Sequence, residues 1–129
     1  MAIAKYAYSA LDCSDPIALA DFYSKLTGWP VEPLGDFPPA DVTWLELLDE
    51  NGKTKMAFQK IENYRRPTWP VGEVQQQVHL DFHVLDMEKA RKEVIEIGAV
   101  QAEFQAAEHF QVFFDPAGHP FCLIKKDSL

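Results

Sequence analysis

The chain contains one pattern twice, a strand followed by a helix and further strands, at a spacing of about 70 residues. In the first copy Asp15 and Pro16 precede an apolar helical stripe that ends at Gly28. In the second copy Asp86 precedes a similar stripe that ends at Gly98. An aspartate before the first helical turn and a glycine after the last one are typical helix boundaries. A duplicated module therefore explains the sequence more economically than two unrelated halves.

Runs of alternating side chains, and the turn residues between them, predict the strands. In the first half we expect strands at 5–13, 43–48 and 55–61, with an irregular loop at 31–40 that contains three prolines. In the second half we expect strands at 77–85, 111–114 and 121–125, and a short strand near 100–104. This order predicts an α+β fold of two tandem βαβββ modules that form a curved mixed sheet around a central cavity.

The length of the chain, 129 residues, is ordinary for one compact domain. We therefore expect a single domain over residues 1–129, with module one at about 1–66 and module two at about 73–129. Between them, Pro67 and Pro70 surround Trp69 in a segment that we interpret as the connector.

Charge restricts the partners of this chain. The formal net charge is −8, and basic residues are not clustered, which argues against nucleic acid and anionic membrane surfaces as partners. No apolar run approaches the roughly 18 residues of a membrane span, and the first residues lack the apolar run of a signal peptide. We therefore expect a cytoplasmic protein. Cys13 and Cys122 lie in apolar runs and are expected to be free thiols.

One face of the first strand in each half is polar. Because strand side chains alternate, His79, Asp81 and His83 share one face, opposite Leu80 and its apolar neighbours. In the first half the matching face carries Tyr8, Ala10 and Asp12. A solid core would leave such groups unpaired, so this pattern favours a polar-lined concavity that binds a small molecule.

Several motifs, distributed in order over nearly the whole chain, resemble those of a known group of proteins. They are Leu-Asp-Cys-Ser-Asp-Pro at 11–16, Leu-Thr-Gly-Trp at 26–29, Pro-Thr-Trp-Pro at 67–70, His-Leu-Asp at 79–81 and Asp-Pro-Ala-Gly-His-Pro-Phe-Cys-Leu at 115–123. This set is similar to the vicinal oxygen chelate superfamily, which includes glyoxalases, bleomycin-resistance proteins and dioxygenases. It looks most like glyoxalase-like proteins common in actinobacteria. The resemblance implies the paired-module fold, whereas the activities of the superfamily are diverse.

The resemblance also implies where a metal would bind. Metal enzymes of the superfamily hold a divalent ion with side chains, commonly His or Glu, from the first and last strand of each module. The matching positions here are Tyr8, Gln59, His79 and Cys122, and only His79 is a habitual ligand. His79 and Asp81 could converge, but two ligands do not make a strong site. We therefore expect no metal and no other cofactor.

Our leading hypothesis is a metal-independent protein that binds a small, partly aromatic organic molecule, and it leaves open whether a reaction is catalysed. The side chains expected to bind the ligand are Tyr8, Trp44, Gln59, Trp69, His79, Asp81 and Cys122. The alternative is a metal-dependent lyase, isomerase or dioxygenase with an unusual site around His79. A third class, a non-catalytic dimerisation module, predicts a filled cavity. Dimers are common among the relatives, and a homodimer stays open here.

Overall fold

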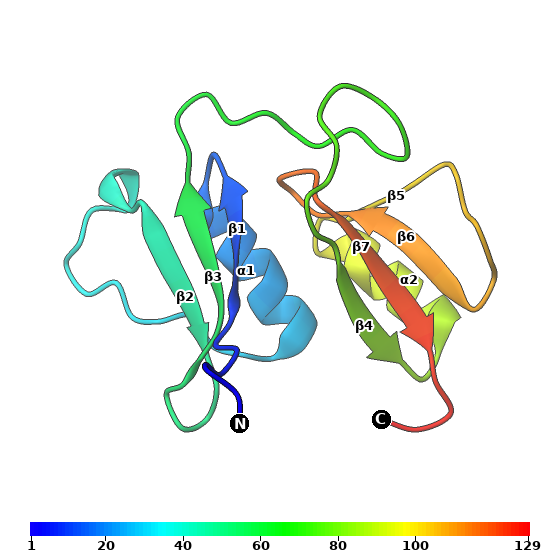
Figure 1. The fold of residues 1–129 in the computed structure, drawn as a ribbon, viewed down its shortest axis with the longest axis horizontal. Helices are drawn as coiled ribbons and strands as arrows, with labels where there is room; N and C mark the ends of the chain where they lie inside the picture. The colour runs from blue at the N-terminus through cyan, green and yellow to red at the C-terminus, as the bar shows by residue number, and fades with distance from the viewer. The chain divides into compact units, whose positions relative to one another are not determined.

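The computed structural model describes all residues from Met1 to Leu129, and they form two compact units (Figure 1). The units are Met1–Tyr64 and Arg65–Leu129, which we call the first and the second module. No helix in either module is long and apolar enough to cross a membrane.

The first module is a three-stranded sheet with one long helix. Its elements are β1 (Ser9–Cys13), α1 (Pro16–Thr27), the 3-10 helix η1 (Pro39–Asp41), β2 (Trp44–Leu48) and β3 (Thr54–Lys60). The sheet order is β1-β3-β2, with β1 parallel and β2 antiparallel to the central strand β3. Helix α1 carries the chain from β1 at one edge of the sheet to β2 at the other edge. The chain then returns along β3 in the centre, so that β1 and β3 lie side by side and run parallel.

The second module repeats this arrangement and adds a strand. Its elements are β4 (Leu80–Val84), α2 (Met87–Glu96), β5 (Val100–Gln101), β6 (Phe110–Phe114) and β7 (Pro120–Lys125). The sheet order is β4-β7-β6-β5, and β4 is parallel to β7 as β1 is to β3. The α+β class and the two similar modules are confirmed.

The helices begin at the two aspartates that the sequence indicates. The Asp15 carboxylate accepts a hydrogen bond from the backbone N–H of Ala18, and the Asp86 carboxylate accepts one from Lys89. Each bond satisfies an N–H group that has no partner within its helix. Helix α1 ends at Gly28, which has a φ of 82°, a left-handed conformation that glycine adopts without a steric penalty.

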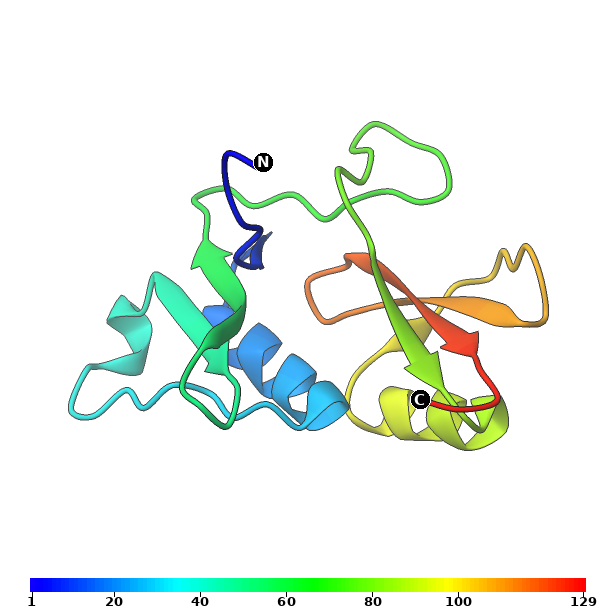
Figure 2. The ribbon, with the colours of Figure 1, turned by 60° about the horizontal axis from the view of Figure 1, so that its bottom comes forward.

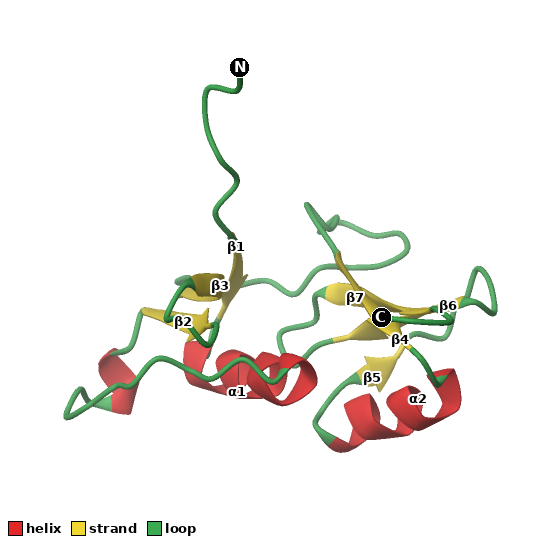
Figure 3. Ribbon diagram, turned by 90° about the horizontal axis from the view of Figure 1, so that it is seen from below, coloured by secondary structure: helices red, strands yellow, loops and turns green.

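Each sheet buries one face against its own helix and leaves the other face without a helix (Figure 3). In the first module Tyr23 of α1 stacks on Phe58 of β3, with ring centroids 5.7 Å apart, and both side chains are fully buried. In the second module Phe113 of β6 stacks on Phe121 of β7 at 5.7 Å, and both are also fully buried. We call the opposite face of each sheet its open face.

Several predicted boundaries differ from the structure. The first strand of each module begins later than predicted, at Ser9 and at Leu80. The second helix ends at Glu96, before the predicted boundary at Gly98. The N–H of Ile97 still donates a hydrogen bond to the carbonyl oxygen of Glu93, but the backbone of Ile97 is no longer helical. In the loop 31–40, Val31 forms only an isolated bridge to Leu47. The flanking prolines lack the N–H groups that a fourth strand would need.

Candidate functional site

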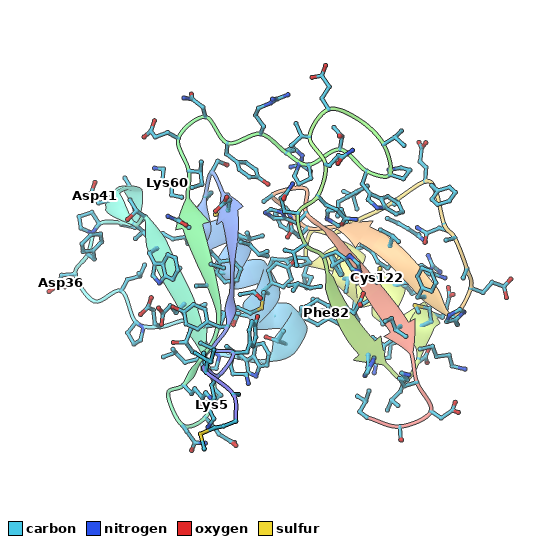
Figure 4. The ribbon with its side chains drawn as sticks, in the orientation of Figure 1. Lys5, Asp36, Asp41, Lys60, Phe82 and Cys122 are labelled. Carbon is cyan, nitrogen blue, oxygen red and sulfur yellow. The ribbon has the colours of Figure 1, made fainter.

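Three side chains that can donate or accept hydrogen bonds meet on the open face of the second module. His79 lies immediately before β4, and Asp81 lies within β4. Cys122 lies within β7 (Figure 4). Asp81 is paired with Cys122 across the parallel strands, so both side chains leave the sheet on the same side. One ligand atom of each residue lies within 4.8 Å of the other two. We call this group the donor cluster.

The donor cluster is arranged around the Asp81 carboxylate. Asp81 Oδ1 lies 3.4 Å from His79 Nε2, and about half of each of these two side chains is exposed (48% and 45%). The Cys122 thiol hydrogen-bonds to the same carboxylate. Burial, the negative charge of Asp81 and this hydrogen bond raise the pKa of Cys122 to about 11. The thiol therefore keeps its proton at neutral pH and donates a hydrogen bond to the Asp81 carboxylate.

Three aromatic rings lie beside the donor cluster in the same module. Phe114 of β6 is paired with Pro120 of β7, two residues before Cys122, so its ring leaves the sheet on the side of the Cys122 thiol. The centroid of the Trp69 ring lies 6.3 Å from that of Phe114 and 5.8 Å from that of Phe104. We call these three rings the aromatic cluster. Neighbouring strands lie about 4.8 Å apart, which separates the Phe114 and His79 backbones by about 10 Å across β7.

An open groove of about 300 Å³ adjoins the aromatic cluster. It is formed by the segment at the start of the module and by the turn between β6 and β7, and its lining residues are Arg66, Pro67, Thr68, Trp69, Val71, Phe114 and Gly118. Figure 2 shows segment 65–79 on the side of the second sheet that faces away from α2. The groove and the donor cluster therefore lie on the same side of this sheet.

The three predicted site residues of the first module also lie together. The rings of Tyr8 and Trp44 meet edge to face, with centroids 6.4 Å apart. Trp44 of β2 is directly paired with Gln59 of β3, on the face opposite the buried Phe58. The structure thus brings the predicted residues into one group on the open face of the first module and another on the open face of the second.

Glu46, which the sequence analysis did not single out, holds the indole of Trp44. The Glu46 carboxylate accepts hydrogen bonds from Trp44 Nε1 at 2.8 Å and from the Thr54 hydroxyl at 2.6 Å. These bonds, that from Thr54 most strongly, hold the pKa of Glu46 below its ordinary value. The alternation of side chains along β2 is the signal that could have predicted this contact, since it puts Glu46 on the face of Trp44.

Comparison with known proteins relates this geometry to a family. The model of the glyoxalase-like domain matches residues 9–124, nearly the whole chain. The chain belongs to the glyoxalase-like domain family. Comparison with curated protein sequences gave no match.

Several solved structures have a similar fold. A glyoxalase/bleomycin resistance protein/dioxygenase family enzyme from Burkholderia phytofirmans PsJN is 18% identical, with a TM-score of 0.64 over 95% of this chain and 98% of that one. The fosfomycin resistance protein FosX from Listeria monocytogenes is 13% identical, with a TM-score of 0.66 over 99% and 94%. A glyoxalase-related enzyme from Fulvimarina pelagi is 17% identical, with a TM-score of 0.62 over 95% and 88%. At these identities the similarity establishes the fold alone.

The register of the two sheets shows that the modules of this glyoxalase-like domain are unequal. Ser9 pairs with Met56 where β1 and β3 begin to run side by side, and Leu80 pairs with Phe121 at the same point of the second module. The pair that corresponds to Asp81 and Cys122 is therefore Ala10 and Ala57. Alanine supplies no polar side-chain atom, so the donor cluster has no counterpart in the first module.

The four positions at which the family resemblance implies metal ligands do not form a suitable set in this chain. Gln59 lies two residues beyond Ala57, the position that corresponds to Cys122, and offers only a neutral amide oxygen. Tyr8 offers a phenol, a weak ligand unless it is ionised. The remaining two residues, His79 and Cys122, belong to the donor cluster.

Some aromatic residues of the site were not singled out in the sequence analysis. Phe58 and Phe113 cannot stack on a ligand, because both are fully buried in the cores of their modules. Phe104 and Phe114 instead contact Trp69. Arg66, which the sequence analysis did not single out, lines the groove. No local signal in the sequence indicates that these segments meet.

Proposed function

We propose that this glyoxalase-like domain binds a small, partly aromatic organic molecule on the open face of its second module, without a resident metal ion. The observation that carries the proposal is the position of two different clusters on one side of one sheet. The donor cluster presents an imidazole, a carboxylate and a thiol, and the aromatic cluster presents Trp69, Phe104 and Phe114.

The two clusters suit the two ends of such a molecule. Stacking of a ligand ring on Trp69 contributes about 0.5–1.5 kcal/mol of binding free energy, in addition to the contribution of the apolar area that is buried. A polar group about 10 Å away can exchange hydrogen bonds with His79 and Asp81, whose exposed atoms are accessible to a ligand. Cys122 contributes by holding the carboxylate in place. Two of the similar structures are named as fosfomycin resistance proteins, which supports a small organic molecule as the ligand class.

Tryptophan fluorescence tests this proposal directly. In a variant with Trp29→Phe and Trp44→Phe, Trp69 is the single indole and reports on the aromatic cluster. Titration with benzoate, benzamide and 4-hydroxybenzyl alcohol is expected to give saturable quenching by at least one of the three. A longer compound, 5-phenylpentan-1-ol, carries a hydroxyl that can reach His79 from a ring on Trp69. His79→Ala is expected to weaken its binding roughly tenfold, because the variant removes a hydrogen bond to the ligand.

A matched control is His83→Ala, since His83 lies in β4 on the same face as Asp81 but outside the donor cluster. This variant is expected to bind as the parent does. If none of the three compounds quenches Trp69 saturably, or if both histidine variants behave alike, the proposal fails.

A second candidate function, metal-dependent catalysis around His79, is favoured by one specific observation. The donor cluster supplies one nitrogen, one oxygen and one sulfur ligand within 4.8 Å, and zinc in catalytic sites is commonly held by three protein ligands. Such an ion would supply Lewis acid chemistry to a bound oxygen atom. These three residues come from one module; His79 and Cys122 are two of the four positions that the family resemblance implies, and Asp81 takes the place of the other two.

Elemental analysis of untagged protein separates the two functions. One zinc, nickel, iron or manganese ion retained per chain, lost in both His79→Ala and Asp81→Ala but kept in His83→Ala, would favour the second candidate and overturn the metal-independent proposal. Metal below about one tenth of an ion per chain in the parent, with saturable quenching of Trp69, would support the metal-independent proposal.

A further inference from the structure

We infer that the groove beside the aromatic cluster recognises the carboxylate of an aromatic acid through Arg66. This inference rests on the proposed function and names its ligand class. Arg66 and the two rings of Trp69 and Phe114 line the same groove, which contains no acidic side chain. A ligand with an aromatic ring and a negatively charged planar group could contact the two rings with the one and Arg66 with the other.

The guanidinium of Arg66 is held in a defined position by the turn between β6 and β7. Arg66 Nη1 donates a hydrogen bond to the carbonyl oxygen of Pro116 at 2.9 Å. Its Nε atom lies where any larger residue at position 118 would collide, because a Cβ on Gly118 would be only 2.8 Å from it. A guanidinium that is already positioned loses less conformational entropy when it binds an anion.

Arg66 also keeps its charge available for a ligand. The neighbouring Arg65 pairs with Glu73 at 3.4 Å, whereas Arg66 forms no ion pair with an acidic side chain. One of its five N–H groups donates to Pro116, which leaves others for a carboxylate. In a chain with a net charge of −8, such an arginine attracts an anion locally while the surrounding surface repels it.

The shape of the groove favours a small planar acid. A carboxylate can accept two parallel hydrogen bonds from a guanidinium, and this geometry holds it in the plane of the fork. A ring attached to the carboxylate can then contact Trp69 and Phe114, whose ring planes are inclined by 69° to each other. The groove volume of about 300 Å³ is at the lower end of the range for small-molecule sites.

Benzoate and benzamide form a matched pair for the test, since they share the ring and differ in charge. Binding is followed in ¹H–¹⁵N NMR spectra by the Trp69 indole N–H and the Arg66 Nε–H signals. We expect benzoate to bind the parent protein at least roughly tenfold more tightly than benzamide. Arg66→Met is expected to abolish this preference, and Arg65→Met, the adjacent control, is expected to keep it.

The outcomes separate this inference from the proposed function. If benzamide binds as tightly as benzoate, or if Arg66→Met keeps the preference, the carboxylate assignment fails while ring binding stands. If neither compound shifts the Trp69 signal, and 4-hydroxybenzyl alcohol does not either, both fail. If Arg66→Met does not fold, the comparison of benzoate with benzamide in the parent protein and in Arg66→Lys decides. Lysine keeps the charge without the fork, so the inference requires weaker benzoate binding in that variant.

Discussion

Asp81 lies directly opposite Cys122 across the parallel strands β4 and β7, and its carboxylate accepts the hydrogen bond of the Cys122 thiol. This pair joins two segments that are separated by a helix and two strands in the sequence. It turns an exposed His-x-Asp strand edge into a group of three interacting side chains.

Asp81→Asn is expected to lower the pKa of the Cys122 thiol from about 11. The substitution removes the negative charge that opposes ionisation, while burial, the largest cause of the shift, remains. The new value is therefore expected to stay above the ordinary 9.0. The rate of alkylation by iodoacetamide as a function of pH measures it, with Cys122→Ser reporting the background from Cys13. An unchanged or higher pKa would contradict the hydrogen-bonded pair.

The raised pKa of Cys122 also predicts how stability depends on pH. The thiol is harder to ionise in the folded protein than in the unfolded chain, whose thiol titrates near 9.0. Its contribution is therefore fully present below about pH 9 and is lost as the pH rises toward about 11. Urea unfolding is the measurement, and the parent should lose stability relative to Cys122→Ser across this window. Parallel curves for the two proteins would disprove the linkage.

Asp115→Ala is expected to destabilise the second module by about 2–3 kcal/mol. Asp115 is almost completely buried, and its Oδ1 accepts hydrogen bonds from the backbone N–H groups of Ala117 and His119 at 2.9 and 3.0 Å. Alanine would leave these donors without their acceptor. Asp49 makes similar bonds in an exposed turn of the first module, so Asp49→Ala is the matched control. Equal losses in the two variants, measured by urea unfolding, would show that burial is unimportant.

Gly28→Ala is expected to cost about 1 kcal/mol of folding free energy. Gly28 has a φ of 82°, and a Cβ at this position would meet no atom within 4 Å. The cost is therefore conformational and not steric. Gly28→Asn should cost less, because asparagine tolerates the left-handed region better than alanine does. Thermal or urea unfolding of both variants tests this order, and the reverse order would count against the assignment.

The local signals of this sequence predicted its helices and strands well. The caps at Asp15 and Asp86 depend on residues three positions away, so they can be identified without tertiary information. Alternation along a strand likewise placed His79 and Asp81 on one face. The two tandem modules of the α+β class follow from these same local features.

The site depended on contacts that local patterns do not encode. Only the register of β4 against β7 puts Cys122 beside Asp81, and a shift by one residue would turn the thiol to the opposite face. The same applies to the first module, where register makes Ala57 the counterpart of Cys122 and leaves Gln59 two residues away.

By itself, therefore, the sequence determined the two capped helices, the polar faces of the first strands and the membership of a paired-module fold, because each depends on neighbouring residues. The tertiary structure decided which of those faces carries three converging side chains. It also decided that Arg66 lies against Gly118 beside Trp69. Strand register and loop packing are set by the burial of whole faces, which no short stretch of sequence specifies.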